Sequence, residues 1–376
     1  MNGLKKISLL LICWISIGLW NGFAASQPVW IHNSLKEIDT CEGKVKLTLV
    51  KIWGDDNTDD ENQYFRYPKD IKISKDGEVF ILDSGNNRIQ VYDRKGTFKR
   101  TIGRRGQGKG DILRPKSIEL DKNGNVIVLD SGNNRIQTFD RNGLYLGCFR
   151  TGSSAPSVII HTGDNKLAAL FLQDQFKRNN VLTLLKPDGT VIRKIGKPHF
   201  IARNQMESET FYLSQDRYSN FYLAFWGTPL IRKLSKEGDS ILNITYEVAY
   251  KCTEVKMNPI TSEPSIKRTE EKRVEAGLAL DEQSRIFLVV AQRDPNKSER
   301  IGFVSDGSGN WMRSKKTIDS ENTDRFRLLV FNNTGKIIAA SRLNVFCDSI
   351  YIYDDHIFII DSNMGMKIYE YIITFL

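Results

Sequence analysis

Short apolar runs alternate with turn-forming residues along most of the chain. Residues 79–82 (Val-Phe-Ile-Leu) and 89–92 (Ile-Gln-Val-Tyr) are two such runs, and Asp-Ser-Gly-Asn-Asn-Arg separates them. Apolar runs rich in β-branched and aromatic residues, bounded by Gly- and Asn-containing turns, are typical of antiparallel strands. After the N-terminus no stretch has the spacing of a long amphipathic helix, so the pattern predicts an all-β protein.

This unit is repeated. Residues 83–90 return unchanged at 130–137, and Pro68 returns as Pro115 at the same offset. A repeat of this length at a fixed offset indicates an architecture built from copies of one structural unit. The apolar second strand of the unit recurs six times, at 78–83, 125–130, 166–171, 220–225, 285–290 and 356–361.

The last unit ends at Leu376 after its third strand, so its fourth strand must come from elsewhere. Residues 45–54 are the expected donor, because 49–54 followed by a loop and Pro68 parallel 98–103 followed by a loop and Pro115. A strand that closes the ring removes the exposed sheet edges of an open array. The sequence therefore predicts a six-bladed β-propeller of four-stranded antiparallel blades, closed by strand 45–54. Its blades are expected to begin near residues 68, 115, 156, 211, 274 and 344.

Residues 68–103 and 115–150 resemble NHL repeats, which have a proline-led strand, an Asp-Gly turn, a strand ending in Asp, an Asn-Asn-Arg-Ile loop and a Gly-rich exit. The resemblance is specific over these two units and looser over the rest; the last unit keeps Asp361 but has no arginine in its loop. It implies a six-bladed propeller used for binding, in a family that includes or neighbours a few enzymes. Fold alone does not choose between these roles.

Residues 1–25 have the pattern of an export signal, with Lys5 and Lys6, an apolar run over 7–20 and small residues at 24–25. A cleaved signal predicts a secreted, periplasmic or extracellular protein, and an uncleaved one a membrane-tethered protein. Residues 26–44 then form an N-terminal segment, and 45–376 form the propeller. An exported chain also argues against nucleic acid as a partner.

After the signal, four cysteines remain, Cys41, Cys148, Cys252 and Cys347, which fit either two disulfides of unknown pairing or unpaired thiols. The net charge of +9 is moderate for this length, and much of it is ordinary surface. Two long insertions, 251–275 and 294–324, interrupt the repeat pattern. Long loops in a compact domain are often functional.

In a propeller, the loops between second and third strands share one face with the connections between blades. We expect this loop face to carry a basic rim over blades one and two that binds carboxylate, sulfate or phosphate groups of a protein, glycan or other polymer. The alternative is that the arginines of the repeated loops pair with Asp83 and Asp130 or with backbone carbonyls inside the blade. The rim consists of Arg88 and Arg135 from the repeated loops, and Arg104, Arg105, Lys109, Arg114 and Lys116 from the connection between the blades.

Three aspartates, Asp83, Asp130 and Asp361, end the second strands of neighbouring blades and are weak candidates for a cation site, for example for calcium. An Asp before Ser-Gly-Asn is more often a turn former, so no cofactor is expected. The Gly-rich run 103–110 lacks the Ser or Thr and the helix of a phosphate-binding P-loop.

The pattern favours a binding or scaffolding module, and no Ser occurs in a Gly-x-Ser-x-Gly nucleophile motif. Four histidines without paired spacing, His32, His161, His199 and His356, give little support to a histidine metal cluster. The alternative is a metal-dependent hydrolase or lyase, lactonase-like or amidating-lyase-like, with its site at the mouth of the central channel.

Overall fold

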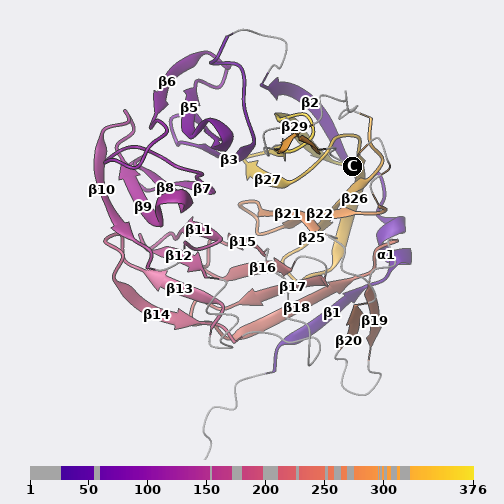
Figure 1. Cartoon of the computed structure of the whole chain (residues 1–376). Helices are drawn as coiled ribbons and strands as arrows, with labels where there is room; N and C mark the ends of the chain where they lie inside the picture. Colours follow the sequence, from indigo (N-terminus) through magenta and orange to yellow (C-terminus); the bar gives the residue numbers. More distant parts are fainter. Residues whose placement is uncertain are drawn as a thin grey trace, which may run out of the picture.

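The strands are arranged as blades around a ring (Figure 1). The computed structural model describes residues 27–54, 60–152, 155–171, 180–197, 211–225, 228–249, 253–257, 264–268, 275–294, 296, 299, 303–305, 311–313 and 322–376. Within these residues, each of the six predicted repeats forms an antiparallel sheet. The prediction of an all-β, six-bladed propeller is therefore confirmed.

The first three blades follow the repeat closely. Blade one contains β3 (Pro68–Ile73), β4 (Val79–Asp83), β5 (Arg88–Tyr92) and β6 (Phe98–Ile102). Blade two contains β7 (Ser117–Leu120), β8 (Val126–Asp130), β9 (Arg135–Phe139) and β10 (Tyr145–Arg150). Blade three contains β11 (Val158–His161), β12 (Leu167–Leu170), β13 (Leu182–Leu185) and β14 (Val191–Ile195).

The other three blades include the predicted irregularities. Blade four contains β15 (Phe211–Gln215), β16 (Phe221–Phe225), β17 (Thr228–Leu234) and β18 (Ser240–Tyr246). Blade five contains β21 (Glu275–Leu280), β22 (Ile286–Ala291), β25 (Phe326–Phe331) and β26 (Ile337–Leu343). Blade six contains β27 (Ser349–Tyr353), β28 (His356–Asp361), β29 (Lys367–Phe375) and, from the other end of the chain, β2 (Val45–Trp53).

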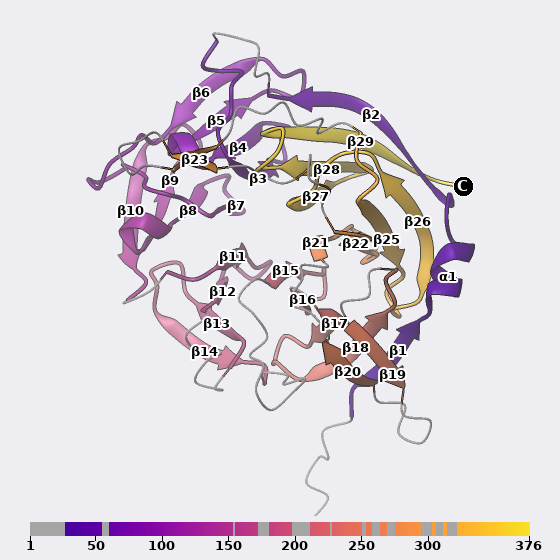
Figure 2. The same ribbon diagram turned by 45° about the vertical axis from the view of Figure 1, so that its right-hand side comes forward.

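The ring closes through this last sheet. β2 runs antiparallel to β29, with Val45 opposite Phe375 and Trp53 opposite Ile368, and these two strands lie side by side in both views (Figures 1 and 2). The first strand of each blade contacts the first strand of the next, and β27 contacts β3. The first strands therefore surround a central channel.

The core lies between neighbouring blades. One cluster joins Phe80, Leu82 and Ile89 of blade one to Val126 and Phe139 of blade two, and similar clusters fill the other five interfaces. Because both faces of each sheet are covered, all residues of a second strand such as β4 are buried. This explains why the second strands are continuous apolar runs, whereas a strand with one wet face would alternate.

The turn between third and fourth strands needs glycine for two reasons, which are clearest at Gly238. Its φ of +99° lies in the left-handed region that side chains rarely adopt. A Cβ atom there would also lie 2.6 Å from the backbone nitrogen of Gly196 in blade three. The glycine thus shapes the turn and lets two blades approach each other.

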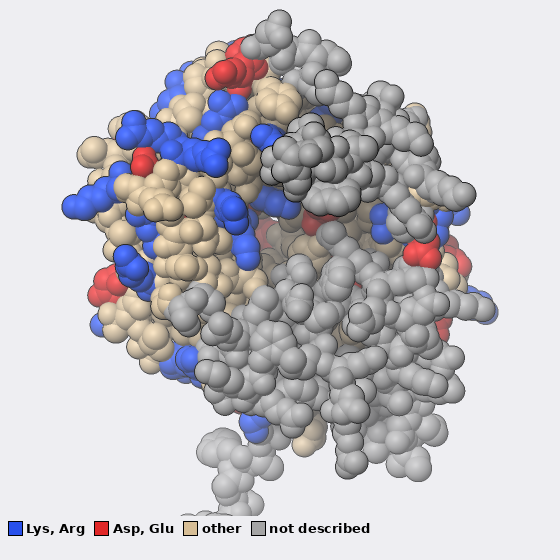
Figure 3. Space-filling model, in the orientation of Figure 1, with Lys and Arg blue, Asp and Glu red and all other residues tan. Residues whose placement is uncertain are grey.

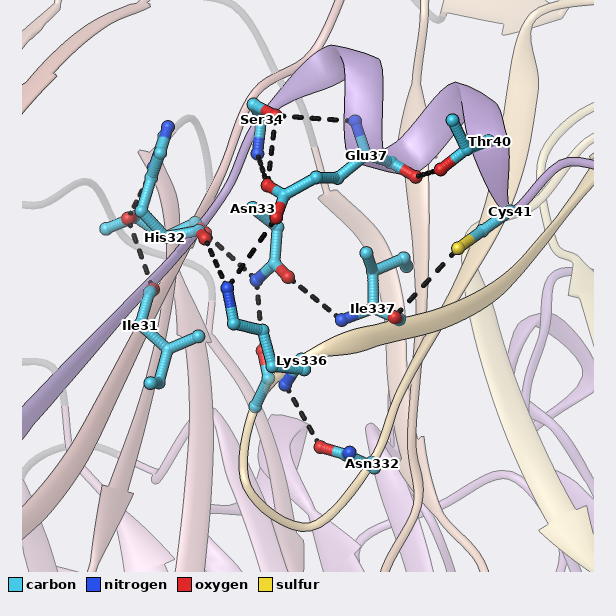
Figure 4. Close-up of polar contacts among 12 residues, drawn as sticks. Ile31, His32, Asn33, Ser34, Glu37, Thr40, Cys41, Asn332, Lys336 and Ile337 are labelled. Carbon is cyan, nitrogen blue, oxygen red and sulfur yellow. Dashed lines mark hydrogen bonds and ion pairs between the residues drawn. The ribbon is translucent and has the colours of Figure 1, made fainter.

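The segment before β2 was predicted only as an N-terminal extension, and it lies along the outer edges of the ring. β1 (Val29–Asn33) pairs in parallel with β18 and adds a fifth strand to blade four. The short helix α1 (Leu35–Thr40) then contacts β26 of blade five, with a capping box between Ser34 and Glu37. Figure 4 shows Asn33 between this segment and blade five. Its buried side chain donates to the Gly335 carbonyl and accepts from the Ile337 N–H, each at 2.9 Å.

Each predicted insertion contains a two-stranded hairpin. β19 (Thr253–Met257) pairs with β20 (Pro264–Arg268), and β23 (Phe303–Ser305) pairs with β24 (Trp311–Arg313). Blade five is therefore one unit with an inserted hairpin, as the repeat spacing predicted.

Of the two alternatives for the cysteines, the structure supports unpaired thiols rather than two disulfides, because Cys41 and Cys148 both carry free thiols. Cys148 is exposed on the outer strand of blade two, and Cys41 is buried beside blade five. Cys252 and the export signal at 1–25 lie outside the described residues. None of the helices in the described part of the chain is long and apolar enough to cross a bilayer.

Asn33→Ala should lower the free energy of unfolding by about 1–3 kcal/mol, because it leaves two buried backbone groups of blade five without their partner. Urea unfolding followed by tryptophan fluorescence measures this change. The matched control is Asn123→Ala in an exposed turn of blade two, which should change stability by less than about 0.5 kcal/mol. Equal effects of the two substitutions would show that the N-terminal segment does not support the ring.

Candidate functional site

The repeated octapeptide binds each blade to the connection that precedes it. In blade one, Asp83 is fully buried and accepts hydrogen bonds from the Arg66 N–H and the Arg88 Nε, at 2.7 and 2.8 Å. Arg88 also donates to the carbonyls of Glu61 and Tyr64. The repeated loop therefore folds onto residues 61–66.

Blade two repeats this arrangement. Asp130 accepts from the Leu113 N–H at 2.7 Å and from Arg135 Nε at 2.8 Å. Arg135 donates further to the carbonyls of Gly108 and Asp111, both at 2.7 Å. Its side chain is only 11% exposed. A buried guanidinium with these partners holds the connection in place and has little capacity for a ligand.

The structure thus separates the predicted rim into two groups. Arg88 and Arg135 pair with Asp83 and Asp130 and with backbone carbonyls, as the alternative interpretation expected. These two arginines therefore stabilise the fold. Arg104 is 86% exposed and pairs with Asp111 at 2.9 Å. Lys109 is exposed on the same connection.

The candidate cation ligands are likewise held by the protein. Besides the bonds of Asp83 and Asp130, Asp361 accepts from the N–H groups of Met364 and Gly365 at 2.7 and 2.6 Å. Burial, and then the neighbouring Asp348, raise the pKa of Asp361 to about 7. Across the described ranges, no three His, Cys, Asp or Glu side chains are grouped so that they could hold a metal ion. His199 lies outside those ranges.

Arg105 and Arg114 do come together, in a hollow on the loop face that we call the basic pocket. It has a volume of about 440 Å³ and lies where the loop of blade one meets the connections on either side of it. Among the described residues, four cationic and no acidic side chains line it. Its lining residues are Arg66, Tyr67, Lys69, Ser84, Gly85, Asn87, Arg105, Leu113 and Arg114.

The arginines of the basic pocket are available for a ligand. In the described part of the chain, Arg66, Arg105 and Arg114 form no ion pair, and all three side chains are exposed. The backbone below them is fixed, because Asn87 Oδ1 accepts from the Arg114 N–H at 2.7 Å. Figure 3 shows Lys and Arg side chains gathered over blades one and two on this face.

Analysis of the sequence missed Arg66, which comes from the connection between blades six and one, and Lys69, which lies at the start of β3. A signal was present, since Lys69 follows Pro68 as Lys116 follows Pro115. The repeat thus aligned Lys69 with a residue already assigned to the rim.

The central channel contains a second group of charges, which we call the charged trio: Asp70, Lys72 and Glu119. Lys72 Nζ lies 3.5 Å from Asp70 Oδ1 and 3.2 Å from Glu119 Oε1. Burial raises the pKa of Asp70, and it raises the pKa of Glu119 to about 7, in both cases against the attraction of Lys72. Burial lowers the pKa of Lys72, but the two carboxylates outweigh it and hold that pKa above its usual value.

Comparison with known proteins supports the fold. A family model, DUF5128, described as a 6-bladed beta-propeller, matches residues 57–278. No curated protein matches the sequence significantly. The match does not confirm the NHL family itself, so that resemblance stays a prediction.

Three solved structures illustrate the similarity. A member of the DUF4221 family from Bacteroides vulgatus has a TM-score of 0.57 and 10% identity, over 88% of this chain and 98% of that one. A protein named "Putative exported protein" from Bacteroides fragilis has a TM-score of 0.55 and 12% identity, over 93% and 100%. Virginiamycin B lyase from Staphylococcus aureus has a TM-score of 0.48 and 12% identity, over 87% and 99%. At such identities the first two show a shared fold alone, and the third carries no argument.

Arg135→Ala should destabilise the protein by roughly 3–5 kcal/mol, because it leaves the carboxylate of Asp130 buried without its charged partner. The control is Arg105→Ala, which removes an unpaired arginine from the same face and should change stability by less than about 0.5 kcal/mol. Unfolding in urea measures both. Similar losses in the two variants would contradict the division of the arginines into internal and ligand-facing groups.

Glu119 should make stability depend on pH. Its pKa of about 7 lies above the ordinary value of 4.5, so the folded protein holds this proton more tightly than the unfolded chain does. The resulting stabilisation is complete below pH 4.5 and is lost as the pH rises through about 7. Glu119→Gln cannot ionise, so the stability advantage of the wild type over this variant should shrink between pH 5 and pH 8, by about 1.4 kcal/mol for each unit of pKa shift.

Urea unfolding at several pH values between these limits measures the difference. Exposed Glu282→Gln is the matched control. A gap between wild type and Glu119→Gln that stays constant with pH would contradict the raised pKa.

Proposed function

This chain belongs to the DUF5128 family of 6-bladed beta-propellers, and from that premise we propose that it is an exported binding module for an anionic ligand. The ligand occupies the basic pocket on the loop face. Its source is a protein, a glycan or another polymer that carries carboxylate, sulfate or phosphate groups. The NHL resemblance of blades one and two supports a binding role, and the signal pattern of residues 1–25 supports export.

One observation carries this proposal: among the described residues, four cationic side chains and no acidic one line a single hollow. Like charges repel one another when they are held close together, and a bound anion removes that repulsion. Guanidinium groups also bind carboxylate, sulfate and phosphate through two parallel hydrogen bonds. A pocket with three arginines therefore has both the charge and the donors that such a ligand requires.

The backbone around the pocket is consistent with a specialised site. Tyr67 and Arg114 have φ values of +51° and +47°, although each precedes a proline, which favours an extended conformation. Sparsely populated backbone conformations cluster at functional sites. They persist here because the loop of blade one bonds to both connections, through Gly85 N–H to the Arg66 carbonyl and Ser84 Oγ to the Pro115 carbonyl.

Replacing Arg105 and Arg114 with Gln should weaken binding to a sulfated dextran at least tenfold for the double variant, since each change removes a charged donor and retains much of the side-chain length. Titration calorimetry in low salt measures the dissociation constant. The control is Lys109→Gln, which removes an exposed charge from the same connection outside the pocket and should have little effect. Equal affinity of the double variant and the wild type would refute the proposed site.

A further inference from the structure

The basic pocket adjoins the central channel, because Lys69 lines both. The channel has a volume of about 560 Å³ and is lined by the first strands of all six blades. This volume is in the range of sites for small ligands, about 300–1,000 Å³. Lys69 lines both the basic pocket and the channel, so a ligand held by one hollow is adjacent to the other.

The channel wall offers donors and acceptors side by side. The side chains of Asp70, Lys72 and Glu119 are 16%, 18% and 13% exposed, so each charge of the trio is partly accessible. Lys72 Nζ also lies 5.1 Å from the centre of the Tyr351 ring. Carboxylates accept hydrogen bonds and an ammonium group donates them, so the trio can contact groups that do both.

A second, independent observation marks the same wall. Ser117 lines the channel, and its side-chain hydroxyl is buried and has no hydrogen-bond partner among the described residues. Ser117 precedes Glu119 by two residues on β7, so both side chains lie on the same side of the strand. Buried hydroxyl groups are normally paired, and an unpaired one beside a cavity needs an explanation such as a ligand.

The remaining wall combines apolar residues such as Val158, Ile160 and Ile350 with polar ones such as His161, Ser214 and Gln215. Sugar rings combine these two properties, because hydroxyl groups at their edges donate and accept while their C–H faces are apolar. An acidic peptide would instead bring further carboxylates toward Asp70 and Glu119, which is unfavourable between like charges.

We propose that the ligand is an acidic carbohydrate, with its anionic group in the basic pocket and a neutral, hydroxyl-bearing sugar in the channel against Asp70, Lys72, Glu119 and Ser117. This inference rests on the proposed function, because the basic pocket supplies the anchor. It adds a second contact that distinguishes a carbohydrate from other anions.

The test compares three probes by titration calorimetry: inorganic sulfate, an oligosaccharide of neutral sugars capped by one uronic acid, and a glutamate-rich peptide of similar length. The wild type should bind the uronate-capped oligosaccharide at least tenfold more tightly than the peptide. Glu119→Gln and Ser117→Ala should each weaken binding of the oligosaccharide several-fold, to about tenfold, and leave sulfate binding unchanged. Arg105→Gln should weaken binding of all three probes, and Lys109→Gln should weaken none.

The outcomes separate the two proposals. If the uronate-capped oligosaccharide and the peptide bind equally, or if both channel variants bind the oligosaccharide like the wild type, the carbohydrate inference is overturned and the anion site remains. If Arg105→Gln changes the binding of no probe, the proposed function fails as well. Two channel variants are used so that the misfolding of one, seen in its circular dichroism spectrum, leaves the other to decide.

Discussion

Pairing between β2 and β29 is the interaction on which the rest of the structure depends. A blade is covered on both faces only when it has a neighbour on each side, and blade six has a complete sheet only when residues 45–53 join it. Trp53 of β2 is part of the core cluster between blades six and one, together with Phe65 and Phe358. Closure therefore also buries apolar area at an interface that an open chain would expose to water.

Closure also builds the candidate site. The chain passes from β2 in blade six to β3 in blade one; this connection contributes Arg66 to the basic pocket, and the start of β3 contributes Lys69. Arg105 and Arg114 come from the next connection, after one complete blade. Two pairs of cations from different parts of the sequence thus meet over blade one because the ring holds neighbouring connections at a fixed distance. The segment of β1 and α1 adds contacts with blades four and five just before the closing strand.

The fold could be predicted because turn-forming residues recur in each repeat. The last repeat also lacks a fourth strand, and residues 45–54 resemble that strand. The position of β1 and α1 could not, since residues 26–44 have no counterpart in the repeat. For the site, the sequence showed which connection was rich in cations but not which cations had partners. Arg88 and Arg105 look alike in a sequence, whereas one donates to Asp83 inside the blade and the other forms no ion pair with any described residue. Only the path of the connection backbone distinguishes them.

In blades one and two, the repeated residues stabilise the fold, whereas the connections outside the repeat determine the charge of the loop face. Their octapeptides are identical, and in both the Asp and Arg side chains bond to the preceding connection in the same way. The connections that follow them differ: residues 103–116 contain five Lys or Arg side chains, and residues 151–157 contain none. The same scaffold loop therefore borders a basic pocket after blade one, while the segment after blade two offers no cation. The repeated residues are required for the ring, so the ligand preference of this propeller must come from the residues that the repeat leaves free to vary.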